Sequence, residues 1–338
     1  MKGILYIDSH GYRGYCNNFI EYLSKKLKVI GGEFSLLDFN IIDNSLYYKN
    51  ELVDLNEFSH VFFCYRCDMV DEPIKNEKKQ PHLSGFNYNY FKNLEDFFIN
   101  NTDLIILNKI KNSEMDYDRI KFFEKMNDHN INIPEYQILY DKKRNLINEK
   151  IDFDSINIKL PFLIRTNCDY GGLNIHYISK KEDFDESFQK LLNYDLASDI
   201  ENKDNRNKVL LATKFYETYN DKLGCRSCCR VILVKSEILC YCIECHKKDS
   251  WIYKINNFKD NNHIYKNRLD TKQLEHFTLA LNNTKYSNLK EFQTESYKFL
   301  INYVKKYEHI FKNLYHIIGL DTFSVDFLSL EDGPIILE

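Results

Sequence analysis

The sequence predicts an α/β protein whose C-terminal part is α+β. Strand-like apolar runs alternate with helical patterns in the N-terminal third, an order typical of a parallel sheet with crossover helices. Further along the chain, short turns separate apolar runs, which is typical of antiparallel hairpins. The length of 338 residues is enough for two or three packed units.

The N-terminal third indicates one parallel α/β unit. Short runs of large apolar residues predict strands at 3–8, 60–67 and 103–108. Helical patterns between these runs predict helices at 16–27 and 86–100. Because strands and helices alternate, crossover connections and a parallel sheet are expected.

The character of the sequence changes at about residue 115. Residues 115–131 have a helical period that places Ile120, Phe123 and Met126 on one face. Beyond this helix, apolar runs predict three strands and an amphipathic pattern predicts a further helix, at 131–139, 160–166, 175–180 and 180–194, in that order. A glycine-containing turn at 167–174 joins the second and third of these strands.

The C-terminal part is predicted to contain two hairpins and one long helix. Five apolar runs predict its strands, at 209–217, 228–234, 238–245, 324–330 and 334–338. Turns at 235–237 and 331–333 close the hairpins, and a single helix is predicted at 295–314. Residues 253–290 are polar and weakly patterned, so no element is predicted there.

Composition and charge limit which partners and which cellular compartment are expected. The formal net charge is −4, from 46 basic and 50 acidic residues, so the basic excess typical of nucleic-acid or membrane partners is missing. No apolar run approaches the length of a membrane span, and the chain start is too soon polar for a secretory signal. Ten cysteines without an export signal therefore indicate a cytoplasmic chain with reduced thiols. A monomer and a homodimer both stay open.

The final hairpin carries the sharpest chemical signal. Asp326 lies in its first strand, and Glu338 ends its second strand. A turn at Asp332 and Gly333 would bring the two acids together on adjacent strands. Two neighbouring carboxylates repel each other unless a cation lies between them. Mg²⁺ is the natural cation, because it binds one or two carboxylates together with substrate phosphates.

The order of motifs along nearly the whole chain resembles the ATP-grasp superfamily, in the style of glutathione synthetase and the ribosomal-protein glutamate ligases. The matching pieces, in chain order, are Asn108-Lys109, Asp118-Arg119, Pro134, Pro161 to Arg165, Asp169 to Gly172, Lys214 to Glu217, Arg230 to Val234, Gly319 to Asp321, Asp326 and Glu338. No single piece is specific, but their joint order is hard to obtain by accident. Arg119 and Arg165 stand where the family usually has lysine.

The resemblance implies a domain plan. A pre-ATP-grasp α/β domain would cover 1–108, and a two-subdomain ATP-grasp fold would cover 109–338. Within the latter, 109–212 would form the central lid subdomain and 213–338 the C-terminal catalytic subdomain. The family has a metal-binding Asn two residues after the second carboxylate, so we expect that the sequence is truncated after Glu338.

The resemblance also implies which residues bind ATP. Lys109 and Arg165 would neutralise phosphates from two sides. The turn with Gly171 and Gly172 would present backbone N–H groups to the phosphates. The hinge strand would contribute the remaining nucleotide contacts, with aromatic side chains at the adenine slot and an acid at the ribose hydroxyls, through Lys214, Phe215, Tyr216 and Glu217.

Other positions would serve the reaction itself. Arg230 would stabilise the charge that develops on an acyl phosphate, and Asp326 with Glu338 would bind Mg²⁺. Arg66 and Asp68, at the end of the second predicted strand, would contact the acceptor substrate.

Each of these residues also has an ordinary structural explanation. Lys109 fits a surface cation, and Arg230 fits an ion-paired structural arginine. Phe215 and Tyr216 fit core aromatics almost equally well. Arg66 with Asp68 fits a local ion pair.

The implied function is an ATP-dependent carboxylate–amine ligase that acts through an acyl phosphate, with ATP and Mg²⁺ as cofactors and a carboxylate and an amine as substrates. Three alternatives stay open. One is a small-molecule kinase on the same fold, and another is a non-catalytic nucleotide-binding member. The third is a zinc module, because six cysteines lie between 225 and 245, although their spacing is not a clean pair of two-residue-gap motifs.

Overall fold

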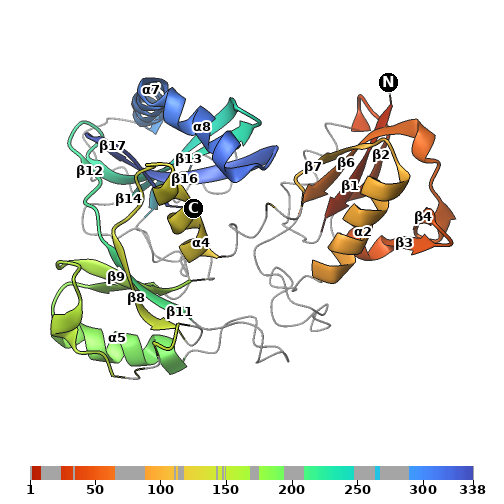
Figure 1. Cartoon of the computed structure of the whole chain (residues 1–338). Helices are drawn as coiled ribbons and strands as arrows, with labels where there is room; N and C mark the ends of the chain where they lie inside the picture. Colours follow the sequence, from red (N-terminus) through yellow and green to blue (C-terminus); the bar gives the residue numbers. More distant parts are fainter. Residues whose placement is uncertain are drawn as a thin grey trace. The chain divides into compact units, whose positions relative to one another are not determined.

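The computed structural model describes residues 2–8, 24–32, 35–64, 88–109, 112, 118–141, 144–146, 148, 150–167, 175–193, 209–246, 263–266 and 289–337. The chain forms two compact units (Figure 1). The first comprises Met1–Tyr117, Asp195–Arg206 and Gly319–Asp321, and the second comprises Asp118–Tyr194, Asn207–Ile318 and Thr322–Glu338. The subdomain boundaries implied by the family resemblance stay predictions.

The first unit is built on a parallel sheet, as the sequence predicts, but the sheet has four strands and its edge strand β2 (Val29–Gly32) is absent from the prediction. The strands have the order β2, β1 (Gly3–Asp8), β6 (Phe58–Cys64) and β7 (Ile105–Leu107). Helix α2 (Tyr88–Asn101) covers one face, where Phe91 and Phe98 pack edge-on against Phe63 (Figure 1). Residues 16–23 of the predicted helix at 16–27 lie outside the described residues.

A small antiparallel sheet in the first unit is absent from the prediction. It consists of β3 (Phe39–Ile42), β4 (Ser45–Tyr48) and β5 (Glu51–Leu52), flanked by the short helices η1 (Ser35–Asp38) and η2 (Leu55–Glu57). Its two-residue turns place Asp43, Asn44, Lys49 and Asn50 at positive φ, between 47° and 67°. Asn tolerates this left-handed backbone better than most residues, which suits tight hairpins.

The second unit contains a four-stranded antiparallel sheet between two helices. Its strands have the order β10 (Ile175–Ile178), β9 (Phe162–Thr166), β11 (Val209–Lys214) and β8 (Tyr136–Asp141). Helix α5 (Glu182–Asn193) covers one face, and α4 (Arg119–Asp128) contributes Ile120 to a cluster with Val209 and Leu211 on the other (Figure 1). These elements confirm the predicted strands and helices to within a few residues, except that β8 starts later.

A second sheet in this unit includes the two predicted hairpins. Its path is β15 (His263–Lys266), β14 (Glu237–His246), β13 (Cys225–Val234), β16 (Thr322–Leu330) and β17 (Gly333–Ile336), with β12 (Tyr219–Asn220) paired to β13. Lys235 takes a positive φ of 54° in the turn between β13 and β14. Strand β15 lies in the segment for which the sequence predicts no element.

The prediction of a single helix at 295–314 is wrong. The structure has α7 (Leu289–Lys306) and α8 (Glu308–Ile318), which meet at Tyr307. The Tyr307 hydroxyl donates to the carbonyl of Glu331 over 2.9 Å, and the Tyr307 ring packs on Tyr303 with centroids 4.9 Å apart. Rings from both helices, those of Tyr303 and Phe311, pack on Phe327 of β16. The apolar spacing continues through residue 307, so the sequence carries no sign of the break.

Strand alternation separates the cysteines of β13. Cys225 and Cys229 are buried on the core face, whereas Cys228 lies on the opposite face, because successive side chains of a strand point to opposite sides. Burial raises the pKa of the Cys229 thiol to about 12, so this thiol stays protonated at neutral pH. A zinc ligand must be a thiolate, so Cys229 is a poor ligand.

The wider zinc hypothesis gains no support from this part of the chain. Across the described ranges, no three His, Cys, Asp or Glu side chains group as metal ligands would. The side chains of Cys240, Cys242 and Cys245 lie outside the described part of β14. None of the described helices combines the length and apolar character that crossing a bilayer would require.

Replacing Phe184 should test the core between α5 and the four-stranded sheet. Its ring contacts those of Phe153, Phe162 and Phe188. We expect Phe184→Ala to lower the free energy of unfolding of this unit by about 3–5 kcal/mol, through lost burial and a cavity. Urea unfolding followed by circular dichroism measures the loss. Val234→Ala, at a side chain 40% exposed, is the matched control and should stay within about 0.5 kcal/mol.

Alkylation should distinguish the two faces of β13. We expect iodoacetamide to modify Cys228 faster than Cys229 in the folded protein at pH 8, because Cys229 is 1% exposed and protonated. Mass spectrometry with fragmentation locates the modified residue. If Cys229 were modified at equal rates in folded and urea-unfolded protein, its burial would be contradicted. Stoichiometric zinc in the purified protein would support the zinc hypothesis.

Candidate nucleotide pocket

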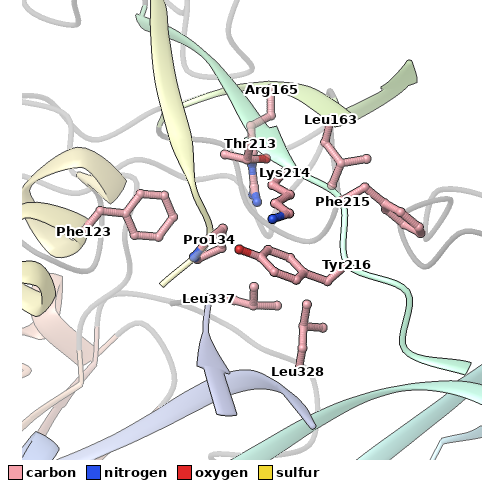
Figure 2. Close-up of a pocket in the computed structure, with 10 residues that line it drawn as sticks. All are labelled: Phe123, Pro134, Leu163, Arg165, Thr213, Lys214, Phe215, Tyr216, Leu328 and Leu337. Carbon is pink, nitrogen blue, oxygen red and sulfur yellow. The ribbon is translucent and has the colours of Figure 1, made fainter. Parts of the chain in front are cut away.

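A pocket in the second unit brings together residues from both of its sheets (Figure 2). Two strands of the four-stranded sheet and the segment after β11 form one side, and the β16–β17 hairpin forms another. Helix α4 and the linker before β8 complete the wall. The lining residues are Phe123, Pro134, Leu163, Arg165, Thr213, Lys214, Phe215, Tyr216, Leu328 and Leu337.

Strand register explains why these side chains share one face. On β9, Leu163 and Arg165 are two residues apart and therefore point to the same side. Thr213 of β11 lies directly opposite Leu163, and Leu211 lies opposite Arg165. Helix α4 packs over Leu211. The pocket is therefore lined by the other three side chains of this face, Leu163, Arg165 and Thr213.

Two cations contribute charge to this pocket. Arg165 is only 8% exposed and lines the pocket. Lys214 is about half exposed, and its Nζ lies 3.4 Å from a carboxylate oxygen of Glu135 and 5.3 Å from the centre of the Tyr216 ring. Cations beside flat apolar walls suit a ligand with an anionic end and an aromatic end.

The two aromatic residues after β11 point in different directions (Figure 2). Tyr216 reaches toward Pro134, and its hydroxyl accepts a hydrogen bond from the Glu135 N–H over 3.3 Å. The Phe215 ring points away from Tyr216 and packs edge-on against Tyr177, with centroids 5.1 Å apart. Tyr216 is therefore the aromatic side chain that extends across the pocket.

Glu217 is held by an arginine that the sequence reasoning missed. The Arg226 guanidinium donates from Nε and Nη2 to the two Glu217 oxygens, over 2.7 and 2.6 Å. This hydrogen-bonded pair lowers the pKa of the Glu217 carboxyl below its usual range. No pattern in the sequence predicts that residues 217 and 226 pair. The one available signal is that Arg226 lies four residues before Arg230, and therefore on the same face of the strand.

Arg230 and Asp326 lie directly opposite each other on β13 and β16. The Arg230 Nη2 donates to one carboxylate oxygen over 2.6 Å, and its Nε donates to the other. The Arg230 side chain is 45% exposed and the Asp326 side chain 19% exposed, so a ligand can reach the pair. The sequence singles out both residues but does not predict this contact.

Asp326 has the donor chemistry of a magnesium ligand. Its two oxygens accept from Arg230, and a carboxylate oxygen can accept more than one contact. Mg²⁺ commonly takes one or two carboxylates plus phosphate oxygens, so this residue fits the ion beside a nucleotide. Leu337, the residue after β17, lies next to it, because its N–H donates to the Asp326 carbonyl over 2.8 Å.

A polar network joins the start of α4 to the end of β9. The Arg119 Nη1 donates to the carbonyls of Thr166 and Asn167, over 3.2 and 2.8 Å. The Asn167 side chain accepts from the Ile120 N–H and donates to Asp118, which caps α4. Arg119, one of the two arginines at family lysine positions, therefore binds main-chain carbonyls here.

Several predicted site residues cannot be related to this pocket. Lys109 is exposed and belongs to the first unit. Arg66, Asp68, Gly171, Gly172 and Glu338 lie outside the described residues. Their roles stay predictions.

Comparison with known proteins identifies the fold. No protein-family model matches the sequence, and a search of curated proteins found no match. Among solved structures, D-alanine–D-alanine ligase from Bacillus anthracis matches with a TM-score of 0.53 and 10% identity, over 100% of this chain and 86% of that one. A RimK domain ATP-grasp protein from Sphaerobacter thermophilus matches with a TM-score of 0.46 and 10% identity, over 99% and 89%. The ATP-grasp ligase PsnB with its minimal precursor matches with a TM-score of 0.47 and 8% identity, over 100% and 90%. At such identities a likeness concerns the fold alone, and the match to the Bacillus anthracis enzyme, with its TM-score above 0.5, confirms the fold that the motif order predicts: the chain has the ATP-grasp fold.

Proposed function

We propose that the chain is an ATP-dependent enzyme that joins a carboxylate to an amine through an acyl phosphate. The observation that carries this proposal is the pocket in which Arg165, Lys214 and Tyr216 meet apolar side chains from the second sheet. The exposed Arg230–Asp326 pair on that sheet adds the charges that phosphoryl transfer needs.

The pocket residues would divide the nucleotide between them. Leu163, Leu328 and Leu337 offer apolar surface to a flat base, and Tyr216 offers an aromatic edge. Arg165 would contact the phosphates, because a buried guanidinium favours an anionic ligand. Lys109, Gly171 and Gly172 are proposed to bind the phosphates from other sides, and Glu217 to accept from the ribose.

The chemistry would proceed in two balanced steps. A carboxylate oxygen of the substrate forms a bond to the γ-phosphorus of ATP as the bond to ADP breaks. The amine nitrogen then attacks the acyl carbon, phosphate leaves with the carboxylate oxygen, and the amine gives up a proton. Arg230 would stabilise the negative charge in both steps. Mg²⁺, when bound by Asp326 and Glu338, would offset charge on the phosphate oxygens. Arg66 and Asp68 are proposed to contact the acceptor.

The shared fold is consistent with this proposal but is not sufficient evidence for it. The Bacillus anthracis protein with the same fold is a D-alanine–D-alanine ligase, so a ligase is one activity that the fold accommodates. A fold alone does not define an activity, and the argument therefore rests on the pocket.

The direct test is ADP release on mixing the protein with ATP, Mg²⁺ and a panel of amino acids and short peptides. We expect a product whose mass is the sum of the two substrates minus one water. A phosphorylated product would favour the kinase alternative. No binding of a nonhydrolysable ATP analogue in calorimetry would contradict both enzyme proposals.

Replacing Arg165 should weaken nucleotide binding. Arg165→Met keeps the approximate side-chain length but removes the cation, so we expect the Kd for a nonhydrolysable ATP analogue to rise roughly 10- to 100-fold, the loss of a charge-assisted contact. Calorimetry measures the change. Arg144→Met is the matched control, because Arg144 pairs with Glu124 and does not line the pocket. An unchanged Kd in Arg165→Met would place the phosphates elsewhere.

Asp326→Asn should abolish Mg²⁺–ATP turnover and leave the fold intact. The amide retains an oxygen acceptor for Arg230 but lacks the charge that a cation requires. The pair is partly exposed, so its loss should cost at most about 1 kcal/mol of stability. ADP release measures turnover, and circular dichroism melting checks folding. Turnover equal to wild type would refute the metal assignment.

A further inference from the structure

The segment after β11 lines the pocket without belonging to a strand or helix. Residues 215–218 link β11 to β12, and Phe215 and Tyr216 are both pocket residues. A segment of this kind must be ordered for binding, and ordering each residue costs conformational entropy. Contacts that order it before a ligand arrives therefore strengthen binding.

Arg226 of β13 contacts this segment at two points. Its guanidinium forms the two-bond pair with Glu217, and its central carbon lies 5.7 Å from the centre of the Phe215 ring. The planar guanidinium suits both contacts, since it pairs with carboxylates through a fork and stacks on rings. The Arg226 side chain is 15% exposed and the Glu217 side chain is 54% exposed, so the pair is partly open to water.

The same segment has further contacts. The Phe215 ring packs edge-on against Tyr177 of β10, and the Tyr219 N–H donates to Glu217 over 2.9 Å. Arg226 thus connects β13 to the segment that follows β11, which belongs to the four-stranded sheet of the same unit.

Arg226 and Arg230 occupy equivalent positions along β13. They are four residues apart, so they lie on one face of the strand, about 13 Å from each other at the rise of a β-strand. Each pairs with a carboxylate through two hydrogen bonds, Arg226 with Glu217 and Arg230 with Asp326. One pair lies beside the pocket-lining segment, and the other is the proposed phosphate-transfer pair.

We propose that Arg226 is a positioning residue for the base-and-ribose end of the nucleotide, which it serves by holding Glu217 and Phe215 in place. This inference rests on the proposed ATP binding. Arg226 acts through its two neighbours and does not itself contact the phosphates.

The test compares three ligands on Arg226→Met: a nonhydrolysable ATP analogue, adenosine and inorganic triphosphate. We expect the Kd for the analogue and for adenosine to rise about tenfold, which corresponds to one or two half-exposed charge-assisted hydrogen bonds. The Kd for inorganic triphosphate should stay within about twofold, because the phosphate-binding residues are untouched. Arg226→Lys should recover part of the loss, since it keeps the charge but not the fork.

A double-mutant cycle identifies the route of the effect. If Arg226 acts largely through Glu217, then Arg226→Met combined with Glu217→Gln should weaken adenosine binding less than the sum of the single effects. Arg144→Met is again the control and should change none of the three constants.

The outcomes separate this inference from the proposed function. Wild-type binding of the ATP analogue with no change in Arg226→Met overturns the positioning role and leaves ATP binding intact. Equal weakening of all three ligands, or a collapse of the melting temperature, indicates a merely structural arginine and also overturns it. A wild-type protein that binds no nucleotide overturns both.

Discussion

The antiparallel pairing of β9 with β11 is the interaction on which the second unit depends. Its register places Arg165 opposite Leu211 and Leu163 opposite Thr213, so one face carries the pocket and the other packs on α5. The side-chain period of a strand is two residues, and a slip by one would therefore turn Arg165 toward the phenylalanines beneath α5. Burying an arginine there would be costly, which selects the observed register.

Arginines in this unit differ in function because they differ in burial and partner. Arg119 is buried and donates to two main-chain carbonyls, so it joins α4 to β9. Arg165 is equally buried but lines a pocket. The Arg230–Asp326 pair is partly exposed, adds little stability and leaves both charges accessible to a ligand. Chemical type alone does not distinguish these roles.

Most regular elements of the fold follow from local patterns. Alternating apolar runs mark β1, β6 and β7, and the helical period of α4 correctly places Ile120, Phe123 and Met126 in the interior. The failures occur where tertiary contacts outweigh local signals. At the α7–α8 break the Tyr307 hydroxyl donates to the Glu331 carbonyl, and no apolar spacing records that contact. The β3–β5 meander has strands of two to four residues, too short for a periodic signal.

The sequence by itself determined the class of fold and named candidate site residues in and just after the strands. It could do so because side-chain alternation and motif order can be read along the chain. Arg165, Lys214 and Tyr216 could thus be named as candidates before their positions were known, and the structure brings them to one pocket. Only the tertiary structure decided that Tyr216 extends across the pocket while the Phe215 ring points away from Tyr216, and that Arg226 holds Glu217. It also decided that Arg230 faces Asp326, 96 residues further along the chain. Contacts between separate strands depend on register and sheet order, which a linear pattern does not contain.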